Sequence, residues 1–241
     1  DAHAPEPEED WEPEEPSERE NLLEPDVLLE EPELPEEGEA QNRQEAFHAD
    51  WTKQYKLARK YLYGGNDVEQ DFSQAFLLFL AEAKTGNALA MYDLGRMCAD
   101  GLGCEADPES AKDWYRKALT AFLVAERTAK ERKLPYLWYR IGKMYAAGLG
   151  TEHKVSGTEG AGEENLGRDY ASAAAWFSKA VSQNHKYAQY SLAGLYYRGQ
   201  GVEQDFSQAF LLYQLSAKQG NPYASYELAK MLGDEIGTDP D

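Results

Sequence analysis

Several features that would point to a particular chemistry are scarce in this chain of 241 residues. It has two cysteines and four histidines, and these lie far apart or at spacings that do not suit a metal ion. It has no apolar run of about 18 residues, the length needed to span a membrane, and no signal peptide. We therefore expect no disulfide framework, no metal, no membrane segment and a cytoplasmic location. The missing initiator Met suggests a fragment of a longer protein.

Positive charge is almost absent from the first forty residues, which contain 18 Asp and Glu and a single base, Arg19. The same stretch holds seven of the eleven prolines. Charge repulsion and too few apolar groups oppose folding, so we predict residues 1–46 to be a disordered acidic arm or linker. Its few apolar residues, such as Trp11 and Leu22-Leu23, are either incidental members of a linker or a short motif that docks on a partner. The rest of the chain has a net charge of only −3, which argues against direct nucleic-acid binding by it.

What the chain does contain is internal repetition. The eleven residues Val68–Leu78 recur letter for letter as Val202–Leu212. Around them runs a degenerate unit in which a tyrosine is followed, two and three residues later, by an apolar and a small residue. Self-similarity at a spacing of about 20–50 residues is typical of a stacked solenoid. The five aligned tyrosines are Tyr55, Tyr92, Tyr139, Tyr190 and Tyr226.

Each unit has the signals of two helices, which we call helix A and helix B. Helix A carries the tyrosine and ends at a Gly-x-Gly or Gly-Gly turn, as at Gly101, because glycine accepts a left-handed backbone. Helix B starts a few residues later at an aspartate that suits an N-cap, as at Asp107. Neither helix can bury its apolar face alone, so the units are expected to stack.

The pattern predicts an all-α fold in which residues 47–241 form four helix pairs and a lone fifth helix A. Two units are irregular. In the second, helix B is predicted to continue to Lys133, just before Pro135. In the third, residues 153–168 are predicted to be a flexible insert loop, because they are rich in glycine and polar residues.

The combined motif resembles the Sel-one-like repeat, a relative of the tetratricopeptide repeat. This resemblance implies a right-handed αα-hairpin superhelix that acts as an adaptor for other proteins. The amino-acid sequences of residues 56–64, 139–148 and 187–193 further resemble the repeat region of MobL-type plasmid mobilisation relaxases. Such an enzyme nicks DNA with a tyrosine and a His-bound metal, but no residue of that centre can be assigned here.

No catalytic constellation is visible, so we predict a non-enzymatic chain without a cofactor. The Gly-x-Gly turns link helix to helix, whereas a dinucleotide-binding loop needs a preceding strand. Cys98 and Cys104 fall at positions that other units fill with apolar or aromatic residues. We interpret them as free thiols acting as small hydrophobic groups.

One pattern points to a binding site. The position after the small residue of helix A is basic in four of five units, and stacking would align these cations in a row. If helix A lines a groove, the row would clamp a protein or peptide partner, for example an acidic one. Alternatively, it is a solvated row paired with neighbouring acids. The candidate contact residues are Arg59, Tyr92, Arg96, Tyr139, Lys143, Tyr190 and Lys230.

The predicted function is therefore a protein-interaction scaffold. The alternative is an accessory region of a relaxase involved in DNA mobilisation. The lone last helix leaves an apolar face uncovered, and the sequence leaves open whether this face associates with a second copy.

Overall fold

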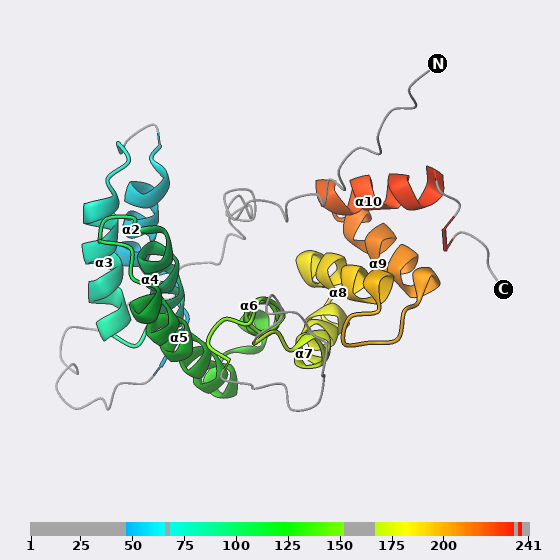
Figure 1. The fold of residues 1–241 in the computed structure, drawn as a ribbon, viewed down its shortest axis with the longest axis horizontal. Coiled ribbons are helices and arrows are strands. Elements are labelled where there is room, and N and C mark those ends of the chain that lie inside the picture. Colours follow the sequence, from blue (N-terminus) through cyan, green and yellow to red (C-terminus); the bar gives the residue numbers. More distant parts are fainter. Residues whose placement is uncertain (1–46, 66–67, 152–166, 234–235, 238–241) are drawn as a thin grey trace, which may run out of the picture. The chain divides into compact units, whose positions relative to one another are not determined.

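A computed structural model describes residues 47–65, 68–151, 167–233 and 236–237. These residues lie in the compact unit Arg43–Asp241. The predicted arm and nearly all of the predicted insert loop fall outside the described residues. The described part is α-helical apart from turns, one short 3₁₀-helix and an isolated bridge between His48 and Asn87, which confirms the all-α prediction (Figure 1).

The described helices follow one another in chain order. They are α2 (Lys53–Tyr63), α3 (Phe72–Lys84), α4 (Ala88–Asp100), α5 (Pro108–Thr128), η1 (Glu131–Lys133), α6 (Leu134–Ala147), α7 (Tyr170–Ser182), α8 (Lys186–Arg198), α9 (Phe206–Lys218) and α10 (Pro222–Gly233).

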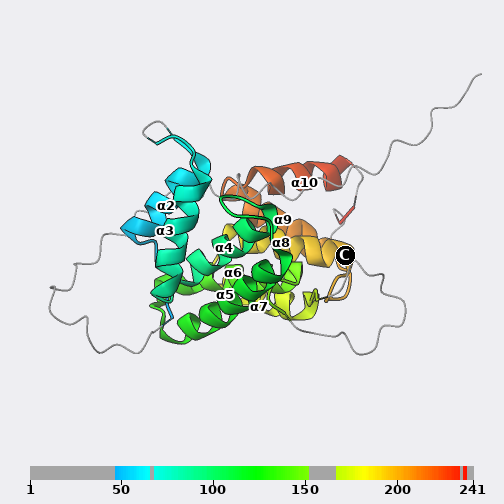
Figure 2. The same ribbon diagram turned by 60° about the vertical axis from the view of Figure 1, so that its left-hand side comes forward.

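Helices pack mainly on their neighbours in the chain (Figure 2). The most extensive contacts are those within a unit, between α2 and α3, α4 and α5, α6 and α7, and α8 and α9. Helix α10 packs on α9. The even-numbered helices are the predicted helices A, and the odd-numbered ones are the predicted helices B.

Local signals set the ends of these helices as expected. Helices α4, α6 and α8 each end at a glycine with positive φ, namely Gly101 at 66°, Gly148 at 70° and Gly199 at 64°. Every described helix B begins at an aspartate whose side chain accepts a hydrogen bond from a backbone N–H of the first turn. These side chains satisfy donors that a helix leaves open at its N-terminus.

An aromatic contact across a small residue joins helix A to helix B in each of the four pairs. The ring of the helix A tyrosine lies 5.5–6.1 Å from an aromatic ring of helix B. The small residue three positions after the tyrosine allows this approach: a Cβ on Gly95 would lie 2.7 Å from the Tyr115 ring, and one on Gly142 would lie 2.6 Å from the Phe177 ring. The four ring pairs are Tyr55–Phe79, Tyr92–Tyr115, Tyr139–Phe177 and Tyr190–Tyr213.

The prediction that helix B of the second unit continues to Lys133 is wrong. Helix α5 ends at Thr128, because Ala129 and Lys130 adopt extended backbone with ψ near 145°. A single 3₁₀-turn then leads into α6, which contains Pro135 in its first turn. Proline is tolerated there because its missing N–H has no partner within the helix.

Candidate binding surface on helices A

The predicted site residues lie on the helices A, so we define the helix-A face as the adjoining sides of α2, α4, α6, α8 and α10. Its best-defined feature is a buried carboxylate, Asp93 on α4, which is 4% exposed. The Tyr55 hydroxyl of α2 donates to Asp93 Oδ2 at 2.7 Å. The Arg96 guanidinium lies 3.3 Å from Asp93 Oδ1. Burial and the nearby Asp93 charge raise the pKa of Tyr55, which keeps this donor protonated.

Cations and aromatic rings alternate beside this carboxylate. The Arg59 guanidinium lies 4.3 Å from the centroid of Trp51 and 5.7 Å from that of Tyr63. Arg96 lies 5.6 Å from the same Tyr63 ring and also donates to its hydroxyl. Burial, followed by the Asp93 charge, raises the pKa of Tyr63 to about 12. The rings hold both guanidinium groups in place while leaving them partly exposed.

A third arginine, which the sequence analysis did not single out, extends the set to α6. The Arg140 guanidinium lies 4.2 Å from the Tyr92 centroid and 5.9 Å from that of Phe122. Arg140 directly follows the unit's tyrosine, and the second unit has Asp93 at that position. This change from a negative to a positive side chain at one register of the repeat is visible in the sequence and marks Arg140 as a candidate contact residue.

On α6 and α8 a cluster of aromatic rings adjoins the cations of the face. The Tyr139 ring lies 4.8 Å from the His185 ring and 6.0 Å from the Tyr187 ring. His185 caps α8, since its Nδ1 accepts a hydrogen bond from the Ala188 N–H at 3.2 Å. Burial, followed by the positive charge of Lys186, lowers the pKa of His185 to about 4. The imidazole is therefore neutral at pH 7.

The predicted contact residues differ in accessibility. Tyr92 and Tyr139 are only 6% and 5% exposed, so their rings serve mainly as packing surfaces. Arg59, Arg96, Lys143 and Tyr190 are partly exposed, and Lys230 is exposed. The structure brings Arg59 and Arg96 together on Tyr63 and places Lys143 6.0 Å from the Tyr139 centroid.

Other chemistry has little support in the described part of the chain. Those residues contain no group of three or more His, Cys, Asp or Glu that could hold a metal ion. None of their helices is long and apolar enough to cross a membrane. Cys98 is a buried thiol whose pKa is raised to about 11 by burial and then by Cys104, so it is a poor nucleophile.

Comparison with known proteins identifies the family. The model of the Sel1 repeat matches residues 54–81, 88–121, 157–185 and 186–221, more than half of the chain. The chain therefore belongs to the Sel1 repeat family, which agrees with the solenoid of helix pairs described above. Proteins of this family are generally modules for protein–protein interaction.

The individual proteins that this chain resembles share between a quarter and a third of their aligned residues with it. Over 180 residues the chain is 31% identical to chitin synthase regulatory factor 3 of Schizosaccharomyces pombe, covering 72% of this chain but only 16% of that protein. A crystal structure of a Sel1 repeat protein from Oxalobacter formigenes is 25% identical, with a TM-score of 0.52 over 78% of this chain and 66% of that one. A protective antigen of uropathogenic Escherichia coli with an SLR fold is also 25% identical, with a TM-score of 0.40 over 76% of this chain and 41% of that one.

Removing the Asp93 carboxylate should destabilise the chain strongly. Asp93→Ala leaves the Tyr55 hydroxyl and the Arg96 charge without their buried acceptor, at an expected cost of about 2–4 kcal/mol in the free energy of unfolding. Asp113→Ala is the matched control, because Asp113 is 61% exposed and pairs with Arg116 on the surface. Urea unfolding followed by circular dichroism measures both, and equal effects would contradict the role given to Asp93.

The buried His185 predicts a pH dependence. Its pKa is near 6.5 when unfolded and about 4 when folded, so the unfolded chain binds the proton first as the pH falls. The free energy of unfolding should therefore decrease by about 2 kcal/mol more between pH 7 and pH 5 than in His185→Asn. Asparagine is the matched substitution because Asn87 caps α4 in the same way. Parallel urea curves for the two proteins at both pH values test this, and equal decreases would exclude His185 as the source.

Proposed function

We propose that this chain is a non-catalytic scaffold that binds an acidic segment of a partner protein along the helix-A face. The observation that supports this most directly is a pair of arginines held over aromatic rings, with Arg59 on Trp51 and Arg96 on Tyr63. A guanidinium fixed in this way loses little side-chain entropy when it binds a carboxylate. It also presents several N–H donors in a geometry that matches a carboxylate.

The proposed contact set divides into two roles. Arg59, Arg96, Lys143, Tyr190 and Lys230 would contact the partner, and Tyr92 and Tyr139 would support the surface from beneath. Arg140, stacked on Tyr92, joins the first group. Because Arg96 also neutralises the buried Asp93, a change at Arg96 would disturb folding as well as binding. Substitutions of the other cations therefore test binding without a direct effect on this buried ion pair.

Neutralising three of the cations should weaken binding to acidic peptides. We expect the variant Arg59→Gln, Lys143→Gln, Lys230→Gln to bind acidic peptides about tenfold more weakly than the unchanged chain. The matched control removes three exposed lysines elsewhere, Lys60→Gln, Lys112→Gln and Lys218→Gln. The measurement is a peptide array graded in the number of glutamates, followed by anisotropy titration of the strongest binders. Equal losses in the two variants would show that only net charge matters.

The alternative function remains a prediction. The resemblance of residues 56–64, 139–148 and 187–193 to relaxase repeats supports the hypothesis that this chain is an accessory repeat region of a plasmid relaxase involved in DNA mobilisation. The coding sequence upstream of this chain is the test. A nicking domain with a three-histidine metal motif would favour the alternative, and a different upstream domain would exclude it.

The outer side of α10 supports the proposal of self-association. Tyr226 and Leu232 are 51% and 53% exposed, whereas the tyrosines aligned with Tyr226 in the first three units are at most 6% exposed. Ala229 is also exposed, although Ala193 at the same register of α8 is fully buried. An apolar helix side of this kind is stabilised when a second copy covers it.

A charge on this side of α10 should weaken association. We expect the chain to dimerise reversibly with increasing concentration, and Ala229→Glu to raise the dissociation constant at least about tenfold, because a buried unpaired charge is costly. Leu77→Glu, at an exposed leucine of α3, is the control. Sedimentation equilibrium reports the result, and a chain that stays monomeric at every concentration would contradict the proposal.

A further inference from the structure

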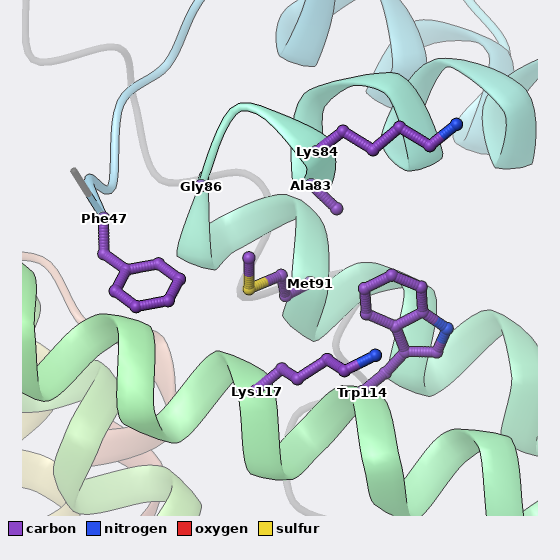
Figure 3. A pocket seen from close by; sticks show the side chains of 7 residues that line it. All are labelled: Phe47, Ala83, Lys84, Gly86, Met91, Trp114 and Lys117. Atoms are coloured by element: carbon purple, nitrogen blue, oxygen red, sulfur yellow. The ribbon is translucent and has the colours of Figure 1, made fainter. Parts of the chain in front are cut away.

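A hollow of about 430 Å³ lies between the segment before α2 and the helices α3, α4 and α5. Figure 3 shows the Phe47 ring, the Met91 thioether and the Trp114 indole around it, with the lysine side chains of Lys84 and Lys117 alongside. None of these residues belongs to the set proposed for the helix-A face. The hollow is therefore a second candidate site, independent of the function proposed above.

The Phe47 wall of this hollow is held in place by its own backbone. The His48 N–H donates to the Gly86 carbonyl at 3.1 Å, and the Ala88 N–H donates to the His48 carbonyl at 2.7 Å. The Asn87 side chain also donates to the Asp50 carbonyl at 2.8 Å. These bonds fix the segment against the α3–α4 turn, so a ligand would meet a wall that needs no further ordering.

Trp114 on α5 packs against the core only in part, and its register does not require a tryptophan. The same register holds Leu212 in the fourth unit, where the leucine is 7% exposed. Trp114 is instead partly exposed, and the Lys117 ammonium lies 4.5 Å from its ring centroid. The third unit repeats this pair as Trp176 and Lys179, at 3.8 Å, outside the hollow. One unit thus provides a natural control for the other.

The lining combines an apolar base with positive charge. Met91 and Ala83 are 5% and 4% exposed and form an apolar base, while Lys84 and Lys117 are exposed. Among the residues that the structure describes, those that line the hollow include no acidic side chain. The neighbouring Glu82 is buried and accepts a hydrogen bond from Asn87 Nδ2 at 3.0 Å. A matching ligand has an apolar group for the base and carboxylates for the two ammonium groups.

We propose that this hollow binds a segment of a partner protein in which an aromatic side chain is flanked by carboxylates. The aromatic ring would lie against Met91, Phe47 and Trp114, where thioether and ring contacts adapt to its shape. The flanking carboxylates would pair with Lys84 and Lys117. A short motif of this kind is a common form of peptide recognition.

The test is a fluorescence anisotropy titration of the whole chain with a labelled peptide, Glu-Glu-Asp-Trp-Glu-Glu. We expect Trp114→Leu and Lys117→Glu each to weaken binding about tenfold. The matched controls Trp176→Leu and Lys179→Glu should change the affinity by less than about twofold. Leucine is already used at this register in the fourth unit, which makes Trp114→Leu compatible with folding.

Three outcomes would overturn the proposal. One is equal weakening by the α5 variants and their α7 controls, which would indicate a general charge effect. Another is unchanged affinity when the tryptophan of the probe is replaced by alanine, since the ring would then not be recognised. The third is tighter binding of the probe by a chain with Trp11→Ala, because the hollow would then take the chain's own acidic segment and not that of a partner.

Discussion

The contact between the tyrosine of helix A and an aromatic ring of helix B, made across a small residue, determines most of this structure. It recurs in all four described pairs at 5.5–6.1 Å. In the second and third units the contact requires glycine on helix A, because a Cβ on Gly95 or Gly142 would lie 2.7 or 2.6 Å from the ring. Aromatic rings bury a large apolar area, so one such contact per unit joins two helices that could not be stable separately.

Burying the tyrosines also creates the polar features of the helix-A face. A buried hydroxyl needs a partner, and for Tyr55 this partner is the carboxylate of Asp93. A buried carboxylate in turn needs a positive charge, which Arg96 provides. The arginines of the surface are therefore fixed by the same residues that stabilise the stack, which connects the proposed binding role with folding.

The units share a scaffold but differ where packing allows variation. The register of Leu212 accepts Trp114 or Trp176 without a change in the helix pair, and a lysine three residues later lies over each indole. Variation at such registers gives each unit its own surface on a common scaffold. The proposed hollow combines one of these variable positions with Phe47, which precedes the first helix.

The sequence by itself determined the helices, because their signals act over a few residues: glycine at Gly101 ends a helix, and aspartate at Asp107 begins one. It also determined their pairing, because the same sequence pattern of helix A followed by helix B recurs in each unit. It did not determine the end of α5, where local helical preference gives way to a turn before Pro135. Nor did it determine the burial of Asp93 or the position of Phe47 beside Met91. Those depend on residues that are far apart in the chain, such as Tyr55 and Asp93 at a separation of 38, and only the tertiary structure brings them together.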